Sequence, residues 1–183
     1  MRILIVGPPG AGKGTQAAVL SAELGVPHIS TGELFRAHVE EETELGRQVK
    51  QYLDAGALVP DEVTNEMVAQ RLTEQDCQAG FLLDGFPRTV RQARMLAGLL
   101  RDLDCELDAV LEFDASENVV VARLLARGRD DDTEDVIRYR QRVYREETAP
   151  LLDFYSDLLV TVPAAGLVPE VTGRALDALR TRA

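Results

Sequence analysis

Lys13 and the glycines before it are the residues whose types and spacing point most directly to chemistry. Residues 7–15 read GPPGAGKGT, and four apolar residues, Ile3 to Val6, stand immediately before them. An apolar strand, a glycine-rich loop, a lysine and a helix start form the phosphate-binding P-loop, whose backbone N–H groups surround phosphate oxygens. The sequence therefore predicts that Lys13 reaches the β- and γ-phosphates and that the Thr15 hydroxyl lies beside Mg²⁺. Gly14 departs from the commonest motif, in which this position is Ser or Thr.

A second chemically suggestive group follows the apolar run 80–84, GFLLD. A carboxylate that ends a buried strand beside a phosphate loop commonly holds the water shell of Mg²⁺, so we predict this role for Asp84 rather than that of a helix cap. Arg88 and Gln92 are four residues apart, which predicts one face of a single helix. Together they offer a guanidinium fork for a phosphate and an amide for a base edge.

Arginines are concentrated in one later segment of a chain whose net charge is -11. They are Arg123, Arg127, Arg129, Arg138, Arg140, Arg142 and Arg145. The overall negative charge argues against a nucleic acid partner, whereas a local cationic region suits a small polyanion. Arg140 shares a predicted helical stripe with apolar residues, and a buried arginine needs an anion. Arg138, Arg142 and Arg145 share another face, which we predict to be solvated.

The elements that must position these residues alternate along the chain. Strands are predicted at 3–6, 27–30, 80–84, 109–113 and 158–162, with helical patterns between them and at 169–179. This alternation predicts an α/β fold of the P-loop NTPase type, with three α/β/α layers around a five-stranded parallel sheet. Ligands of such sheets bind at the carboxyl ends of the strands. Helix starts are predicted at Asp61, Ser116 and residues 132–133, with a kink at Pro150 in a long helix that runs to Tyr155.

Length and composition fit one cytoplasmic domain. A chain of 183 residues suffices for a single full-sized core. No apolar run approaches the ~20 residues of a membrane span, and Arg2 leads into the first strand without a secretory segment. Cys77 and Cys105 lack metal-ligand spacing, so we expect reduced thiols in a reducing compartment. We therefore expect neither a membrane nor a nucleic acid as partner.

Five segments of the chain resemble the signature stretches of the adenylate kinase family, in similar order and spacing. They are GPPGAGKGTQ, ISTGELFR, GALVPDE, FLLDGFPRTVRQA and RYRQRVYREETAPLLDFY. The resemblance covers nearly the whole chain and implies Mg²⁺-dependent, reversible phosphoryl transfer from ATP to AMP, which gives two ADP. It also implies one adenylate kinase domain over 1–183, with an AMP-binding segment at 30–59 and a vestigial lid at 127–132, and it suggests a monomer.

The resemblance also implies which residues bind each nucleotide. ATP would be held by Gly10, Ala11, Gly12, Lys13, Gly14, Thr15, Arg123, Arg127 and Gly166. AMP would be held by Thr31, Arg36, Ala57, Leu58, Val59, Gly85, Phe86, Pro87, Arg88, Gln92, Arg129 and Arg140. The catalytic group would be Lys13, Arg88, Arg129 and Arg140, with Asp84 and Thr15 behind the Mg²⁺. The family usually has Asp at the position of Glu33.

The lid is the largest departure from the family. Longer members insert some tens of residues there, often with four zinc-binding cysteines, whereas here 127–129 is followed at once by three aspartates at 130–132. Both cysteines lie elsewhere, so we expect no zinc. A lid excludes water from the reaction. In this chain the short segment 127–132 must exclude water with its arginines. We interpret Asp130 as a helix cap, while Asp131 and Asp132 either cap or brace arginines.

Three alternatives remain at this point. In the related pyrimidine monophosphate kinases the position of Thr31 is typically Ala and the strand-end turn reads NGFPR, so Thr31 and Asp84 favour AMP. A GTP-dependent kinase is disfavoured because Gln16 resembles the ATP-using members. A regulatory module that binds nucleotides without turnover is the third.

Overall fold

The computed structural model describes residues 1–129 and 132–181 and contains a five-stranded parallel sheet in the order β2-β3-β1-β4-β5. The strands are β1 (Arg2–Val6), β2 (His28–Ser30), β3 (Phe81–Asp84), β4 (Ala109–Asp114) and β5 (Leu159–Pro163). In this register Asp84 lies beside Ile5 on one side and Ser30 on the other. The predicted P-loop NTPase-type sheet is confirmed, and its carboxyl ends bring the predicted phosphate loop and Asp84 to one edge.

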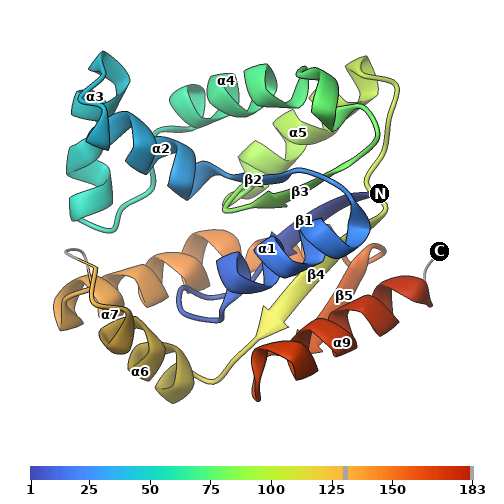
Figure 1. Ribbon diagram of the computed structural model, residues 1–183. Helices are drawn as coiled ribbons and strands as arrows, with labels where there is room; N and C mark the ends of the chain where they lie inside the picture. Colours follow the sequence, from blue (N-terminus) through green and yellow to red (C-terminus); the bar gives the residue numbers. More distant parts are fainter. Residues whose placement is uncertain (130–131, 182–183) are drawn as a thin grey trace.

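Helices cover both faces of the sheet and complete three layers (Figure 1). One face carries α1 (Lys13–Leu24), α6 (Glu117–Arg127) and α9 (Val168–Arg180), and the other carries α4 (Asp61–Leu72), α5 (Val90–Asp102) and α8 (Pro150–Phe154). Successive residues of β1 enter opposite layers, with Ile3 and Ile5 on the first face and Leu4 and Val6 on the second. This is why the strand reads as a continuous apolar run. Among the described residues, no helix is long and apolar enough to cross a bilayer.

Helices α2 (Thr31–Glu40) and α3 (Glu44–Asp54) form a small unit with its own apolar cluster around Phe35, Val49 and Val59. In Figure 1 this unit lies at the left, above α6 and α7 (Glu134–Val143), and both chain termini lie at the opposite end. Gly56 ends the unit so close to α7 that a Cβ there would lie 2.9 Å from side-chain atoms of Val136 and Arg140. The α2–α3 unit therefore faces α7 across the carboxyl ends of the strands.

Two predictions about helix starts were wrong. Pro60, not Asp61, occupies the N-cap of α4, and the Asp61 carboxylate instead accepts a hydrogen bond from Gln92 Nε2 at 2.8 Å. Arg88 does not share a helix with Gln92, because Thr89 caps α5 by accepting from the Gln92 N–H, which leaves Arg88 in the preceding loop. Both differences bring loop and helix residues together through side-chain contacts instead of helical spacing.

The predicted long helix is interrupted earlier than the kink at Pro150. After α7 comes a π-helical turn, η2 (Tyr144–Thr148), in which the Ala149 N–H donates to Tyr144 O at 2.8 Å. Proline lacks an N–H, and here the widened hydrogen-bond pattern comes in the turn before it. The Thr148 hydroxyl donates to Arg88 O at 2.9 Å. The interruption thus joins this segment to the loop that carries Arg88.

Two other predicted starts are placed correctly. Thr133 occupies the N-cap of α7 and its hydroxyl accepts from the Val136 N–H. Ser116 occupies the N-cap of α6, although its side chain makes no capping hydrogen bond. Asp132, also predicted at the start of α7, points its carboxylate at arginines instead.

Candidate active site

The loop between β1 and α1 is tightly packed against α6. Gly10 has φ of 90°, and a Cβ there would lie 2.5 Å from Val120 O, so no other residue fits without displacing α6. Lys13 Nζ donates to Gly7 O at 2.7 Å and Pro8 O at 3.0 Å. Burial lowers the pKa of Lys13 to about 8. A phosphate in this loop would give the lysine a full counter-charge.

Asp84 is a buried carboxylate beside the loop. Its Oδ2 lies 3.8 Å from His28 Nε2 and 3.8 Å from the position that a Cβ of Gly14 would take. Burial raises the pKa of Asp84, but His28, Lys13 and Arg88 together hold it below its ordinary value. The group therefore stays ionised next to the phosphate site, and Thr89 rather than Asp84 caps α5.

The donor set fits a hard cation such as Mg²⁺. The Asp84 carboxylate lies beside Gly14, and Thr15, the next residue, is exposed; both side chains carry oxygen atoms of the kind that Mg²⁺ prefers. The described part of the chain contains no group of three or more metal-ligating side chains. A Mg²⁺ at this position would therefore depend on phosphate and water oxygens for most of its coordination.

A pocket lies between the α2–α3 unit and the end of β3. It is lined by Thr31, Gly32, Phe35, Leu53, Ala57, Leu58, Val59, Thr64, Gly85, Arg88 and Gln92. The structure thus brings together most residues predicted for AMP, and it adds Gly32, Phe35, Leu53 and Thr64, which the sequence left among core or helix residues. The pocket has a volume of about 30 Å³, whereas small-molecule sites typically enclose about 300–1,000 Å³. In this conformation the pocket is therefore smaller than a nucleotide needs.

Three hydrogen bonds hold one wall of this pocket. Gly85 O accepts from Thr31 Oγ1 at 2.9 Å and from Arg88 Nε at 2.8 Å, and Gln92 Oε1 accepts from the Arg88 N–H at 2.7 Å. Burial lowers the pKa of Arg88, with Asp84 acting in the opposite direction. The half-buried Arg88 guanidinium is thus held at the pocket wall.

The remaining predicted AMP residues are at the margin of the pocket or behind it. The Arg36 guanidinium packs against Gly32, with Nη1 3.3 Å from the position of a Cβ there. Phe86 and Pro87, joined by a cis peptide bond, are buried and do not line the pocket. Their side chains support the turn on which Arg88 stands.

Asp132 contacts several described residues of the segment 127–132, which the sequence predicts to be a vestigial lid and which we call the stub. Its side chain is 0% exposed, and it accepts from Arg127 Nε at 2.8 Å and Arg127 Nη2 at 2.6 Å. It also accepts from the Arg129 N–H at 3.1 Å and contacts Arg140 Nη1 at 3.4 Å. Of the two interpretations for Asp132, the arginine brace is correct. Asp130 and Asp131 lie outside the described residues.

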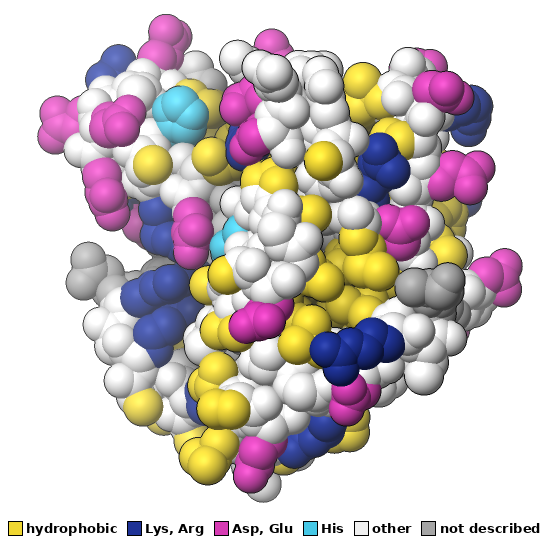
Figure 2. Space-filling view, turned by 45° about the vertical axis from the view of Figure 1, so that its right-hand side comes forward, with side chains coloured by type: hydrophobic (Ala, Val, Ile, Leu, Met, Phe, Trp, Pro, Cys, Tyr) yellow, Lys and Arg dark blue, Asp and Glu magenta, His cyan; other side chains and the backbone are white. Residues whose placement is uncertain are grey.

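Positive charge exceeds negative charge on this side of the cleft. Burial lowers the pKa of Arg140 to about 10, and Arg127, Arg88, Arg129 and Arg36 add to the shift. Figure 2 shows Lys and Arg side chains gathered in the hollow at the left of that view. A partly buried group of cations is a site that a polyphosphate would neutralise.

Burial lowers the pKa of Arg36 and Arg129 as well, and Glu33 opposes the shift at both. The longer carboxylate at this position therefore still acts on the two arginines that face the cleft.

The three arginines predicted to be solvated are all exposed. Arg138 pairs with Glu134 at 2.5 Å and Arg145 lies 3.7 Å from Glu117. The Arg142 guanidinium carbon lies 5.1 Å from the centre of the Tyr139 ring. The side chain of Arg140 is 17% exposed, so Arg140 is more buried than these three neighbours, as the sequence predicts.

Arg123 and Arg127, predicted to act together on ATP, have separate partners. Arg123 Nη1 donates to Ala11 O at 3.2 Å and Nη2 to Ala164 O at 2.9 Å, so it joins the phosphate loop to the loop after β5. Arg127 is held by Asp132 instead. Gly166 lies in the loop after β5, next to Leu167, which is 70% exposed. An unusually exposed leucine beside Gly166 leaves an apolar surface near Arg123.

Two buried glutamines were missed as contributors to the site. Gln141, 4% exposed, donates from Nε2 to Pro9 O at 2.9 Å and so ties α7 to the phosphate loop. Gln16, 3% exposed, donates to Val168 O at 3.1 Å and accepts from Thr172 Oγ1 at 2.8 Å. Glutamine among charged helical residues carries no local sign of burial, so the sequence offered no signal for Gln141.

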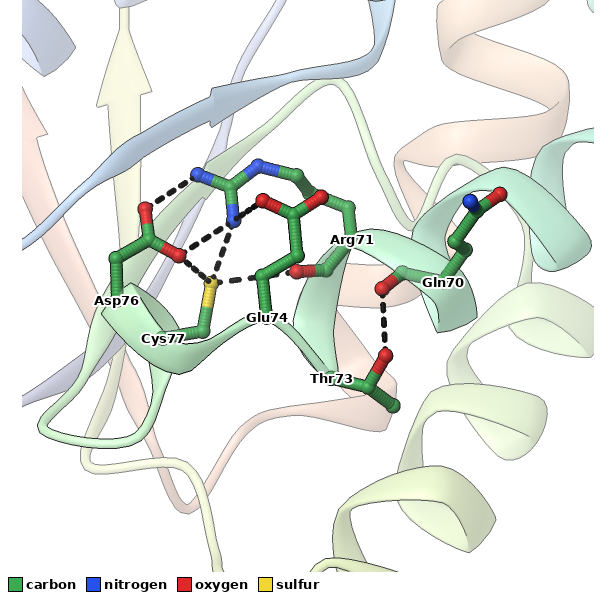
Figure 3. Close-up of polar contacts among 6 residues, drawn as sticks. All are labelled: Gln70, Arg71, Thr73, Glu74, Asp76 and Cys77. Carbon is green, nitrogen blue, oxygen red and sulfur yellow. Dashed lines mark hydrogen bonds and ion pairs between the residues drawn. The ribbon is translucent and has the colours of Figure 1, made fainter.

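A cluster of polar side chains around Arg71 lies away from the cleft, where α4 ends and the short helix η1 (Gln75–Cys77) begins (Figure 3). Arg71 donates to both carboxylate oxygens of Asp76 at 2.8 and 2.7 Å, and its Nη1 lies 3.3 Å from Glu74 and 2.9 Å from Cys77 Sγ. Burial raises the pKa of the Cys77 thiol to about 11. This cluster joins the end of α4 to η1.

Comparisons with known proteins give one consistent result. The family model for adenylate kinase matches residues 5–159. The adenylate kinases of Rhodococcus erythropolis and Nocardia farcinica are each 62% identical to this chain over 179 residues, which cover 98% of it and 99% of each relative. The adenylate kinase of Corynebacterium glutamicum is 59% identical with the same coverage.

Proposed function

The chain belongs to the adenylate kinase family and is a nucleoside monophosphate kinase that converts ATP and AMP to two ADP; from this premise we propose how its residues divide the work. The phosphate loop holds ATP, the pocket under α2 and α3 holds AMP, and the arginines between them carry the transferred phosphate. The observation that supports this division is the position of Arg88, which lines the pocket and lies close enough to Lys13 to lower the pKa of that lysine.

Catalysis in this arrangement comes from positioning and charge neutralisation, as phosphoryl transfer requires. Lys13 is the first residue of α1, after the loop that follows β1, and Arg88 lies in the loop after β3, the strand that pairs with β1. Arg129 and Arg140 come from the stub and α7, which face the movable α2–α3 unit. Closure of that unit on AMP would bring the second pair onto the phosphate and expel water.

The ATP-binding residues would be the loop 10–15 together with Arg123, Arg127 and Gly166. The AMP-binding residues would be those that line the pocket, with Arg36, Arg129 and Arg140 at its open side. Mg²⁺, when bound with ATP, would offset the charge of its phosphates, and Asp84 and Thr15 would hold the waters around it. We further propose a cytoplasmic monomer with one domain over 1–183, an AMP-binding segment at 30–59 and a lid at 127–132.

The acceptor preference tests the pocket assignment. An assay that couples ADP formation to NADH oxidation is run with ATP and each of AMP, CMP, UMP and GMP. We expect turnover with AMP to exceed turnover with the pyrimidine nucleotides, because the Thr31 hydroxyl and Gln92 amide shape the base side of the pocket. Comparable rates with CMP or UMP would refute that assignment.

The role of Arg88 is tested directly by Arg88→Ala. We expect turnover to fall by about three orders of magnitude or more while the fold persists, because a buried cation at the transferred phosphate is lost. Arg94→Ala, at an exposed position on α5, is the matched control and should retain normal turnover. Near-normal activity of Arg88→Ala would reject the mechanism.

A further inference from the structure

Asp132 gathers three segments of the chain around one carboxylate. Arg127 comes from the end of α6, the Arg129 N–H from the stub and Arg140 from α7, and all three reach the same side chain. The Asp132 N–H also donates to Arg129 O at 2.8 Å. The described residues on either side of 130–131 therefore meet at a side chain that solvent does not reach.

We propose that Asp132 is a positioning residue that stands in for a phosphate group before a nucleotide binds, holding Arg127 and Arg140 where the phosphate chain will meet them. This inference rests on the proposed roles of Arg127, Arg129 and Arg140 in the cleft.

Electrostatics supports a role beyond simple folding. Burial of a carboxylate costs free energy that only close cations recover, and two guanidinium groups without an anion between them repel each other. Arg140 is 17% exposed and lies among four other arginines that lower its pKa. The Asp132 carboxylate, in contact with both Arg127 and Arg140, offsets this repulsion before a nucleotide arrives.

The two arginines are held unequally. To Asp132 itself, Arg127 donates two short, parallel hydrogen bonds, whereas Arg140 Nη1 lies 3.4 Å from the carboxylate. Bidentate pairs are the stronger and more directional of the two arrangements. Among the contacts of Asp132, the pair with Arg127 is therefore the stronger.

A helix cap does not account for the contacts of Asp132. The cap of α7 is the Thr133 hydroxyl, which accepts from the Val136 N–H. The Asp132 carboxylate instead accepts from the Arg129 N–H, on the side of the stub that precedes the helix. Its removal would leave the cap of α7 intact.

The test compares Asp132→Asn, which keeps the shape and removes the charge, with Asp132→Glu, which keeps the charge and moves it outward. Asp135→Asn, at an exposed position in the first turn of α7, is the matched control. For each variant kcat and the KM values for ATP and AMP are measured, together with the dissociation constant of inorganic tripolyphosphate and the Tm.

We expect Asp132→Asn to lower kcat by about tenfold or more while tripolyphosphate binds as tightly as before or more tightly, since a competing carboxylate is gone. Asp132→Glu should have an intermediate kcat, about three- to tenfold below the wild type. A purely structural role would weaken tripolyphosphate binding and turnover together, and that result overturns the proposal. A wild-type kcat in Asp132→Glu also overturns it, even should Asp132→Asn fail to fold.

A double-mutant cycle separates this inference from the proposed function. In an Arg127→Ala/Arg140→Ala background, Asp132→Asn should lower kcat less than about twofold further, because the residue acts through these two arginines. Normal turnover of Arg140→Ala itself would refute the proposed function. Loss of turnover in Arg140→Ala with normal turnover in Asp132→Asn would refute the positioning role alone.

Discussion

Two arginine–aspartate pairs in this chain have nearly the same local geometry and opposite surroundings. Arg71 donates two hydrogen bonds to Asp76 at 2.8 and 2.7 Å, and Arg127 donates two to Asp132 at 2.8 and 2.6 Å. Around Arg71 the further groups are a carboxylate and a thiol, and the hydrogen bond that Arg71 donates to Asp76 is the largest cause that raises the pKa of Arg71. Around the second pair, the other described groups that contact Asp132 belong to arginines, the Arg129 N–H and Arg140 Nη1.

The difference in surplus charge separates a structural cluster from a binding cluster. In the cluster at Arg71 (Figure 3), the carboxylates of Glu74 and Asp76 neutralise the guanidinium, so this cluster has no excess positive charge to attract an anion. Among the described residues, Arg127 and Arg140 share the Asp132 carboxylate and lie near Arg36, Arg88 and Arg129, so a polyphosphate could still bind between these cations. The two pairs have the same number of hydrogen bonds and differ in the charge of the groups around them.

The largest expected effect comes from the cation-rich cluster. Arg140→Ala should lower kcat by about three orders of magnitude, because it removes a cation from the transferred phosphate. Its Tm should stay the same or rise, since one charge leaves a crowded set of arginines. ADP formation and thermal unfolding measure the two effects, and Arg138→Ala, 74% exposed on the same helix, serves as the control. A large loss of Tm with unchanged kcat would contradict the comparison.

A smaller effect is expected where the α2–α3 unit meets α7. Gly56→Ala places a Cβ 2.9 Å from Val136 and Arg140 at φ of 68°, so we expect a kcat reduction of about tenfold as well as a stability loss of about 1 kcal/mol. Gly25→Ala has φ of 65° with nothing within 4 Å of the new Cβ, so it shares the strain without the contact. Equal kcat values in the two variants would show that the contact between Gly56 and α7 does not affect turnover.

The cluster at Arg71 should give the reverse pattern. Arg71→Leu removes hydrogen bonds to charged partners from a side chain that is 20% exposed, so we expect a loss of about 1–3 kcal/mol in the free energy of unfolding. Because the site is remote from the cleft, kcat should stay within about twofold of the wild type. Urea unfolding and the coupled assay test the two halves, and a tenfold loss of kcat in a folded variant would place this cluster in the catalytic unit.

The smallest expected effect is on thiol chemistry in the same cluster. Burial raises the pKa of Cys77 to about 11, so at pH 8 only about one thiol in a thousand is ionised and labelling by a thiol reagent should be slow. A thiol whose pKa is raised on folding stabilises the native state below its unfolded pKa. The Cys77 contribution to the free energy of unfolding should therefore fall as pH rises from about 9 to 11. Rapid labelling of Cys77 in the folded protein at pH 8 would contradict this.

Local sequence predicted the sheet and the phosphate loop because both depend on neighbouring residues. A strand buried on two faces must be apolar at every position, as in residues 3–6, and a loop that surrounds phosphate needs glycines at set intervals. The same reasoning failed at Asp61, whose residue type predicts a cap, because Gln92 and Arg91 compete for its carboxylate. It failed again before Pro150, where the π-helical turn follows from tertiary contacts.

The AMP side was predictable only in part. Thr31, Arg88 and Gln92 were identified by motif, and the structure places all three around one pocket. Phe35 and Leu53 line that pocket too, yet each reads as an ordinary apolar residue on an amphipathic helix. Their role depends on how α2 and α3 are set against β3, which no helical pattern specifies.

The sequence by itself determined the order of the strands along the chain, the phosphate loop and the selection of Arg140 over its neighbours, because each is written in the period and polarity of adjacent residues. Only the tertiary structure decided that Gln141 would hold Pro9 and that Arg123 would hold Ala11, pairs 132 and 112 residues apart. Only it decided that Asp132 would face three arginine residues instead of capping its helix. These contacts form when separate elements are packed together, so their energies depend on distances that a linear pattern does not contain.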